Sequence, residues 1–168
     1  MSIIYGLDPG TIQSALCGIR RTDSGAIMLT EFCTLMNPDM LTLLRQLQHR
    51  EIHQSRSLVI EQIQSMGMAV GQEVFQTVWW AGRLYEAWPN ANRYQLPRRP
   101  IKLHLCGNMQ AKDSNVRQAL LDKFGGETAI GRKASPGPLY GLKGHEFAAL
   151  AVAVTWLETQ TVGVRIDT

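Results

Sequence analysis

Two acidic residues each end a short apolar run, and they are the residues of this chain best placed to do chemistry. Asp8 is followed at once by Pro9 and Gly10, which favour a tight turn. Glu61 follows the apolar residues 58–60. Two carboxylates at neighbouring strand ends repel one another unless a cation lies between them. The pair therefore favours a metal site, whereas an isolated Asp8 would more simply cap the turn.

The elements that must position this pair can be predicted from the hydrophobic pattern. Residues 3–8, 14–20 and 26–35 are predicted to form three antiparallel strands, with a hairpin turn at 22–25. Asn37, Pro38 and Asp39 are expected to cap a helix that runs to residue 47, and residues 57–61 to form a strand. A right-handed crossover through this helix puts Asp8 and Glu61 at the same edge of the sheet.

The second half of the chain alternates helices with short extended segments. Residues 62–70 are predicted to form a loop over the site, 71–88 a long helix and 93–96 a strand. Residues 101–107 form one more short segment, a helix is expected at 112–124, and residues 134–138 form a loop. Trp79 and Trp80 could stack on bases, but an aromatic core or a dimer face is the favoured interpretation.

The last predicted helix, residues 144–159, brings two further candidate ligands. His145 and Glu146 lie in its first turn, and small alanines along it allow close packing on a sheet. A ligand that enters from the start of this helix would complete the set begun by the two strand-end carboxylates.

Composition limits the classes of protein to consider. At 168 residues with 45% hydrophobic residues, the chain is expected to fold as one globular domain, residues 1–168. No apolar run approaches a membrane span and no secretory signal is visible, so an intracellular, cytoplasmic location is expected. The three cysteines show no CxxC spacing and are interpreted as small core residues.

Positive charge gathers in the second half of the chain. The net charge of +3 is mild, but the basic residues flank the predicted acidic site. Such a flank suits a phosphodiester substrate, since Lys and Arg would hold the phosphates on either side of the bond to be cut. A solvated surface is the alternative. The basic residues are Arg98, Arg99, Lys102, Lys112, Arg117, Lys123, Arg132, Lys133 and Lys143.

Three motifs, taken in order, resemble the RuvC family of Holliday junction resolvases, especially phage-borne versions. They are the stretch from Gly6 to Thr11, the stretch from Val59 to Gln62, and Ala149-Leu150-Ala151 on the last helix. The resemblance implies an RNase H-like α/β fold, with a central mixed sheet of three antiparallel strands and then parallel strands, flanked by helices. It also implies a homodimer that cuts four-way DNA junctions with the help of divalent metal ions, in the bacterial cytoplasm if the protein is phage-encoded.

The resemblance also assigns roles to individual residues. Asp8 and Glu61 match the first two acidic ligands, and His145 matches a position at which the family uses Asp or His. Lys102 resembles a lysine near the junction backbone, and Lys112-Asp113 resembles a later pair in reversed order. The residues predicted to contact DNA are Lys102, Lys112, Arg98, Arg99, Arg117 and Gln64.

Two positions depart from the family pattern. Ala148 stands where the family carries its last catalytic Asp, and Gln64 stands where it carries an aromatic residue that stacks at the junction. Ala148 motivates an alternative function, that of a junction-binding protein whose cleavage is reduced or lost. A second alternative, an actin-like ATPase, needs another lobe for which 168 residues leave no room.

The expected chemistry is hydrolysis with two Mg²⁺ ions about 4 Å apart. Asp8 is expected to bridge both ions and Glu61 to hold one of them. His145 or Glu146 would hold the other, and an imidazole ligand would make Mn²⁺ more competitive.

Overall fold

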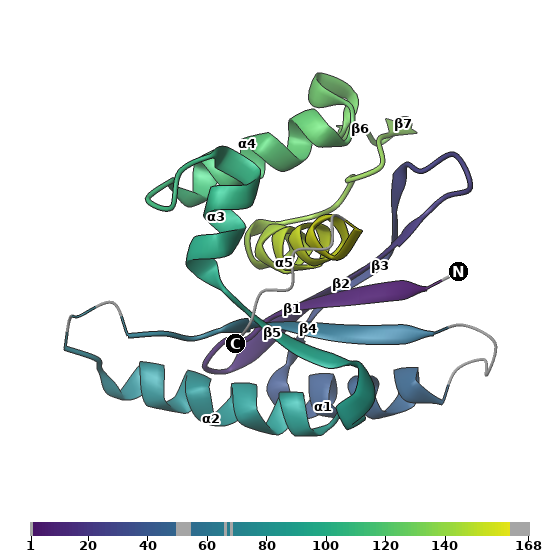
Figure 1. Ribbon diagram of the computed structural model, residues 1–168. Helices are drawn as coiled ribbons and strands as arrows, with labels where there is room; N and C mark the ends of the chain where they lie inside the picture. The colour runs from purple at the N-terminus through teal and green to yellow at the C-terminus, as the bar shows by residue number, and fades with distance from the viewer. Residues whose placement is uncertain (1, 50–54, 66, 68, 162–168) are drawn as a thin grey trace.

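The computed structural model describes residues 2–49, 55–65, 67 and 69–161, which form a mixed five-stranded sheet with helices on both faces (Figure 1). The sheet order is β3-β2-β1-β4-β5, in which β1, β2 and β3 are antiparallel and β1, β4 and β5 are parallel. This confirms the predicted mixed sheet. The strands are β1 (Ile3–Asp8), β2 (Gln13–Arg21), β3 (Ile27–Met36), β4 (Arg56–Gln62) and β5 (Arg93–Pro97).

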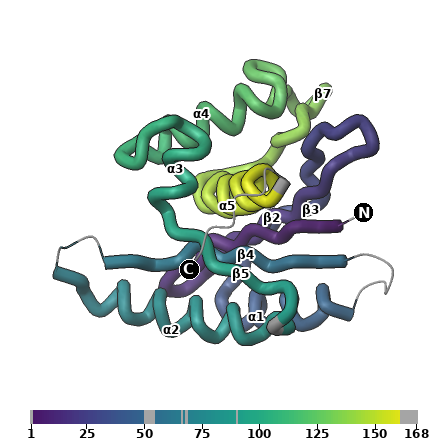
Figure 2. Tube along the Cα trace, in the orientation of Figure 1, coloured from purple at the N-terminus to yellow at the C-terminus, as the bar shows by residue number. Residues whose placement is uncertain are grey.

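The helices form two layers, one on each face of the sheet (Figures 1 and 2). One layer holds α1 (Asn37–Gln48) and α2 (Gln72–Glu86). In the other, α5 (Gly144–Thr161) lies directly on the sheet, and α3 (Arg98–Cys106) and α4 (Asp113–Lys123) pack against α5. Short elements complete the chain, namely the 3-10 helices η1 (Asn90–Asn92) and η2 (Gly126–Thr128) and the hairpin of β6 (Gly131–Arg132) and β7 (Ser135–Pro136).

Alternate residues of the central strands supply two separate cores. Tyr5 and Leu7 of β1 pack with Met40, Leu44 and other residues under α1 and α2. Ile4 joins the core beneath α5 instead. Because side chains of a strand alternate between faces, Gly6 and Asp8 share the α5 face with Ile4.

Gly6 sets how closely α5 approaches the sheet. A Cβ at this position would collide with the backbone oxygen of Ala149 and would lie 2.7 Å from the backbone nitrogen of Ala153. The helix therefore rests on bare backbone, and the small alanines predicted to allow close packing do so. This contact fixes the height of the start of α5 above the end of β1.

Three features of the fold were not predicted from the sequence, and one is that the predicted loop 134–138 contains strand β7, which pairs with β6. Residues 101–106 belong to helix α3 (Arg98–Cys106), and Gly107 follows its end with a φ of 67°. Pro100 fits in its first turn because the backbone N–H it lacks has no partner within the helix there. The aromatic-core interpretation is wrong for Trp79, which is 58% exposed.

In the described part of the chain, no helix is long and apolar enough to cross a membrane.

Replacing Gly6 with Ala should destabilise the protein, because the added methyl group must push α5 off the sheet. We expect a loss of about 1–3 kcal/mol of unfolding free energy, measured by urea denaturation. Gly71→Ala is the control, since Gly71 is exposed before α2, has a φ of −83°, and a Cβ there meets nothing within 4 Å. The control should change the unfolding free energy by less than about 1 kcal/mol. Equal stabilities for Gly6→Ala and wild type would contradict the close contact.

Candidate active site

The two strand-end carboxylates lie side by side, as predicted. Leu7 of β1 is aligned with Ile60 of β4, so the next residues along these parallel strands are Asp8 and Glu61. Their side chains are only 13% and 7% exposed. Both residues share the sheet face that α5 covers, since Gly6 and Val59 lie two positions before them.

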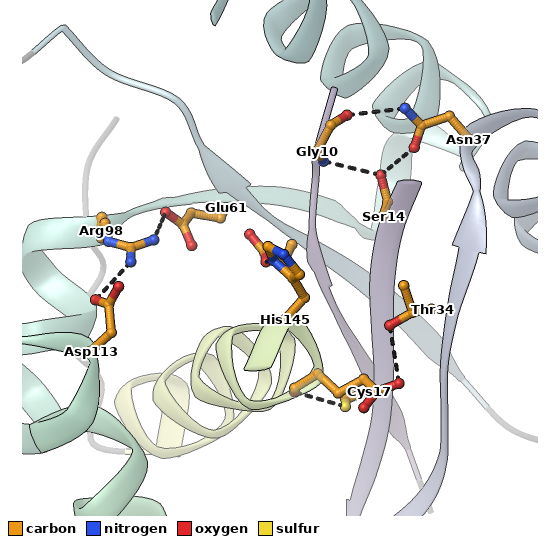
Figure 3. Close-up of polar contacts among 11 residues, drawn as sticks. Gly10, Ser14, Cys17, Thr34, Asn37, Glu61, Arg98, Asp113 and His145 are labelled. Carbon is orange, nitrogen blue, oxygen red and sulfur yellow. Dashed lines mark hydrogen bonds and ion pairs between the residues drawn. The ribbon is translucent and has the colours of Figure 1, made fainter. Parts of the chain in front are cut away.

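A buried polar cluster holds the turn that follows Asp8. The side chain of Asn37 donates to the backbone oxygen of Gly10 (3.0 Å) and accepts a hydrogen bond from the Ser14 hydroxyl (2.6 Å). That hydroxyl accepts from the N–H of Gly10 at 3.3 Å (Figure 3). Asn37 was predicted to cap α1, but the N-cap is Met36, which makes no side-chain cap. Asn37 instead anchors the turn beside the site.

His145 reaches the site from the start of α5. Its Nδ1 lies 3.0 Å from Oδ2 of Asp8, and its side chain is 71% exposed. The helix contributes Ala148 and Ala151 to the same side, one and two turns further along. His145 thus meets Asp8 as the sequence predicted, while position 148 contributes a methyl group.

A chain of charges completes the other side of the site. Nη1 of Arg98 lies 2.8 Å from Oε1 of Glu61, and Nη2 lies 2.7 Å from Oδ1 of Asp113 (Figure 3). Nζ of Lys102 lies 3.4 Å from the same Asp113 oxygen. Arg98 opens α3 and Asp113 opens α4, so two helix starts meet the end of β4. Sequence reasoning placed Arg98 on DNA and did not predict that it pairs with Glu61.

These side chains surround an open cavity of about 480 Å³. Asp8 and Glu61 form part of its wall together with the basic residues Arg98, Lys102 and Arg117. Arg117 also stacks over the ring of Phe147, with its guanidinium carbon 4.7 Å from the ring centre. The lining residues are Asp8, Pro9, Glu61, Arg98, Ile101, Lys102, Asp113, Ser114, Val116, Arg117, Gly144, His145, Phe147, Ala148 and Ala151.

The remaining predicted DNA contacts lie outside this lining. Arg99 and Lys112 are exposed next to Arg98 and Asp113 respectively, and so flank the cavity along the chain. Gln64 is exposed in the loop after β4, where its side chain donates to Gln62 at 3.3 Å. Residues 66 and 68 of that predicted loop lie outside the described residues.

Glu146 does not reach the site, which corrects its prediction as a possible metal ligand. Its carboxylate accepts hydrogen bonds from the backbone N–H of Lys143 (2.6 Å) and the hydroxyl of Thr34 (3.0 Å). Adjacent residues on a helix point about 100° apart, so Glu146 faces β3 while His145 faces β1. Glu146 satisfies a free N–H at the start of α5 and ties the helix to the sheet.

Burial and neighbouring charges shift the pKa values of several side chains at the site. Burial raises the pKa of Asp8 from its ordinary 3.8 to about 6, and the charge of Glu61 adds to the shift, while His145 and Arg98 oppose it. Burial alone would lower the pKa of Arg98, but the neighbouring Glu61 and Asp113 raise it far above its usual value. Burial alone would likewise raise the pKa of Asp113, but Arg98 and Lys102 hold it below its ordinary value.

The donors at this site suit a hard divalent cation. Asp8 and Glu61 offer carboxylate oxygens and His145 an imidazole nitrogen, a set that accepts Mg²⁺ or Mn²⁺. Burial and, after it, the charge of Glu61 raise the pKa of Asp8, and a bound cation would offset both effects by favouring the ionised carboxylate. Among the residues that the structure describes, no three His, Cys, Asp or Glu side chains are already gathered tightly enough to hold an ion. Glu61 is instead engaged by Arg98.

Solved structures of Holliday junction resolvases share this fold. RuvC from Thermus thermophilus matches with a TM-score of 0.68 at 16% identity, over 96% of each chain. The same protein in complex with Holliday junction substrate gives 0.69 at 17% identity, over 97% of each chain. The yeast mitochondrial resolvase gives 0.59 at 15% identity, over 95% of this chain and 79% of that one. The sequence matches no family model and no curated protein. The predicted RuvC-type, RNase H-like fold is thus confirmed.

Asp8 should make the stability of the metal-free protein depend on pH. Between about pH 4 and 6 the folded chain keeps a proton on Asp8 that the unfolded chain has lost. The contribution of Asp8 to the unfolding free energy therefore falls as the pH rises through this window. Asp8→Asn cannot ionise at this position, so its stability relative to wild type should rise by about 2 kcal/mol between pH 4 and 7. Urea unfolding in EDTA measures this difference; a constant difference across the range would contradict it.

Proposed function

We propose that this protein is a metal-dependent endodeoxyribonuclease that binds and resolves four-way DNA junctions. One observation carries the proposal: Asp8, Glu61 and His145 meet at one edge of a RuvC-type sheet, in a cavity that is also lined by basic side chains. Acidic residues beside basic ones suit a phosphodiester, since the acids hold cations at the scissile phosphate and the bases hold its charge.

The reaction is hydrolysis of one phosphodiester bond. A water oxygen forms a bond to phosphorus, a P–O ester bond breaks, and a proton passes to the leaving sugar oxygen. A divalent ion, Mg²⁺ or Mn²⁺, would be held by Asp8 and His145 with Glu61 beside them, and would supply Lewis acidity to the reacting phosphate. Arg98 and Lys102, on the cavity wall, are placed to hold the negative charge of the phosphate.

Ala148 supports a second candidate function. It lines the cavity on the side of α5 that faces Asp8, yet its methyl group cannot bind a cation. On the side of the cavity formed by α5, few side chains can therefore bind the second of the two ions expected from the sequence. A protein that binds junctions and cuts them slowly or not at all is the alternative.

Binding of branched DNA would extend beyond the cavity. We assign the contacts with flanking phosphates to Arg99 and Lys112, which are exposed around it, together with the cavity residues Arg98, Lys102 and Arg117. Gln64 lies exposed in the loop after β4 and is proposed to contact the junction at that point. Such contacts hold the DNA in register without reading its sequence.

We further propose a homodimer formed through the outer face of α2. Resolving a four-way junction takes two cuts, and the described part of this chain presents one site. On α2, the side chains of Phe75, Val78 and Trp79 are 65%, 48% and 58% exposed and share one face of the helix. Leu84 is the one residue of α2 counted as buried. Such an apolar patch is typical of a protein interface.

Replacing Asp8 by Asn should abolish cleavage and spare binding. The amide keeps the shape of the side chain but loses the charge that holds a cation. We expect cutting of a four-way junction in Mg²⁺ or Mn²⁺ to fall by about 10³-fold or more, which is about 4 kcal/mol of barrier. Junction affinity, measured by gel shift in Ca²⁺, should stay within about threefold because phosphate contacts dominate it.

Asp39→Asn is the control, since Asp39 is exposed at the start of α1 and away from the cavity lining. It should cut like wild type. Full cleavage by Asp8→Asn would remove Asp8 from the mechanism. A wild-type chain that binds junctions tightly but cuts none in either metal would favour the second candidate function.

A charge on the outer face of α2 should separate the dimer. Trp79→Glu places a carboxylate within the apolar patch, and we expect a wild-type mass of twice 18.8 kDa to fall to that of one chain. Size-exclusion chromatography with light scattering measures this. Leu103→Glu, at an exposed leucine of α3, should leave the dimer intact. A wild-type protein that runs as a monomer at micromolar concentration would contradict the proposal.

A further inference from the structure

The guanidinium of Arg98 lies between two carboxylates at the edge of the active site. Its two terminal nitrogens bind different acids, Glu61 at 2.8 Å and Asp113 at 2.7 Å. A planar guanidinium bridging two carboxylates in this way resembles a cation shared by two ligands. Lys102 adds a further positive charge on Asp113, which helps to fix that end of the bridge.

The opposite wall of the cavity offers little to a second metal ion. Along α5 the residues that line it after His145 are Phe147, Ala148 and Ala151, and none of their side chains can bind a cation as a ligand. The donors therefore divide into two halves. Asp8 and His145 are in contact on one side, and Glu61 is held by Arg98 on the other.

The negative charges of the buried acids Glu61 and Asp8 also indicate that Arg98 belongs to the active site. Glu61 is 7% exposed and lies close enough to Asp8 to help raise its pKa. Arg98 remains charged at every working pH and opposes that shift. Its own side chain is 42% exposed, so the guanidinium both neutralises a buried acid and stays open to a ligand in the cavity.

We propose that Arg98 is the second cation of this active site, in place of a second metal ion, so that cleavage takes one divalent ion on the Asp8 and His145 side. Arg98 would hold Glu61 in position and donate to a non-bridging oxygen of the scissile phosphate. It gives up no proton in the reaction and acts through its fixed charge. The inference rests on the proposed nuclease function and replaces the expectation of two ions.

Counting bound Mn²⁺ in the absence of DNA tests the arrangement without relying on activity. We expect isothermal titration calorimetry on the full chain to give one ion per wild-type chain. Arg98→Ala should give two, because it frees oxygens of Glu61 and Asp113 for a second ion. Arg98→Lys keeps a charge beside Glu61 and should still give one. Arg99→Ala, the matched control at an exposed neighbouring arginine, should also give one.

Single-turnover cleavage of a four-way junction provides the second measurement. Arg98→Ala should lower the rate by about 10²–10³-fold, the usual effect of removing one donor to a transition-state charge. Raising Mn²⁺ should recover much of this loss in Arg98→Ala, since a second ion can then take the place of the guanidinium. Circular dichroism of each variant confirms that it is folded before it is assayed.

Two ions on the wild-type chain, or the same count before and after Arg98→Ala, would overturn the role of Arg98. So would an Arg98→Ala variant that cuts at the wild-type rate. If the ion count rises from one in the wild-type chain to two in Arg98→Ala, but the wild-type chain cuts no junction, the nuclease function is overturned while Arg98 still takes the place of a second ion.

Discussion

The close contact between α5 and the backbone at Gly6 is the constraint on which the site depends. Asp8 lies two residues beyond Gly6 on the same sheet face, and His145 lies one turn before Ala149, whose carbonyl oxygen occupies the space above Gly6. The 3.0 Å contact between Asp8 and His145 is therefore set by how near the helix can come to the strand. Any side chain at position 6 would lift the helix and part the two residues. A backbone detail in the core thus decides the geometry at the sheet edge.

Two buried polar groups secure the same edge from either side. Asn37 holds the turn after Asp8 through Gly10 and Ser14, and Glu146 fixes the start of α5 through Lys143 and Thr34. Neither group faces the cavity. Because unpaired polar groups are costly inside a protein, each of these bonds also specifies one arrangement of the chain around the site.

The three antiparallel strands, the crossover and the meeting of Asp8 with Glu61 could be predicted from local pattern, while the resemblance to RuvC added the mixed sheet and the role of His145. Hydrophobic alternation located the strands, and parallel pairing brought their ends together. The roles of Arg98, Asp113 and Glu146 could not be predicted, since they depend on where the starts of α3, α4 and α5 meet in space. Arg98 could be recognised as basic, but its partner Glu61 lies 37 residues away on another element. Glu146 follows His145 directly, and only the rotation of the helix separates their roles.

The site therefore combines two buried carboxylates with two charged side chains that are more exposed. Asp8 and Glu61 are nearly buried on neighbouring strands, whereas Arg98 is 42% exposed and Asp113 71% exposed at the starts of α3 and α4. Exposed charges can exchange partners at low cost, while buried ones cannot. Under the proposed nuclease function, a phosphate entering the cavity would compete with Asp113 for the guanidinium and leave its bond to the buried Glu61 in place. The substrate would then exchange one anion for another at Arg98, and the carboxylate pair of the sheet would keep its geometry throughout.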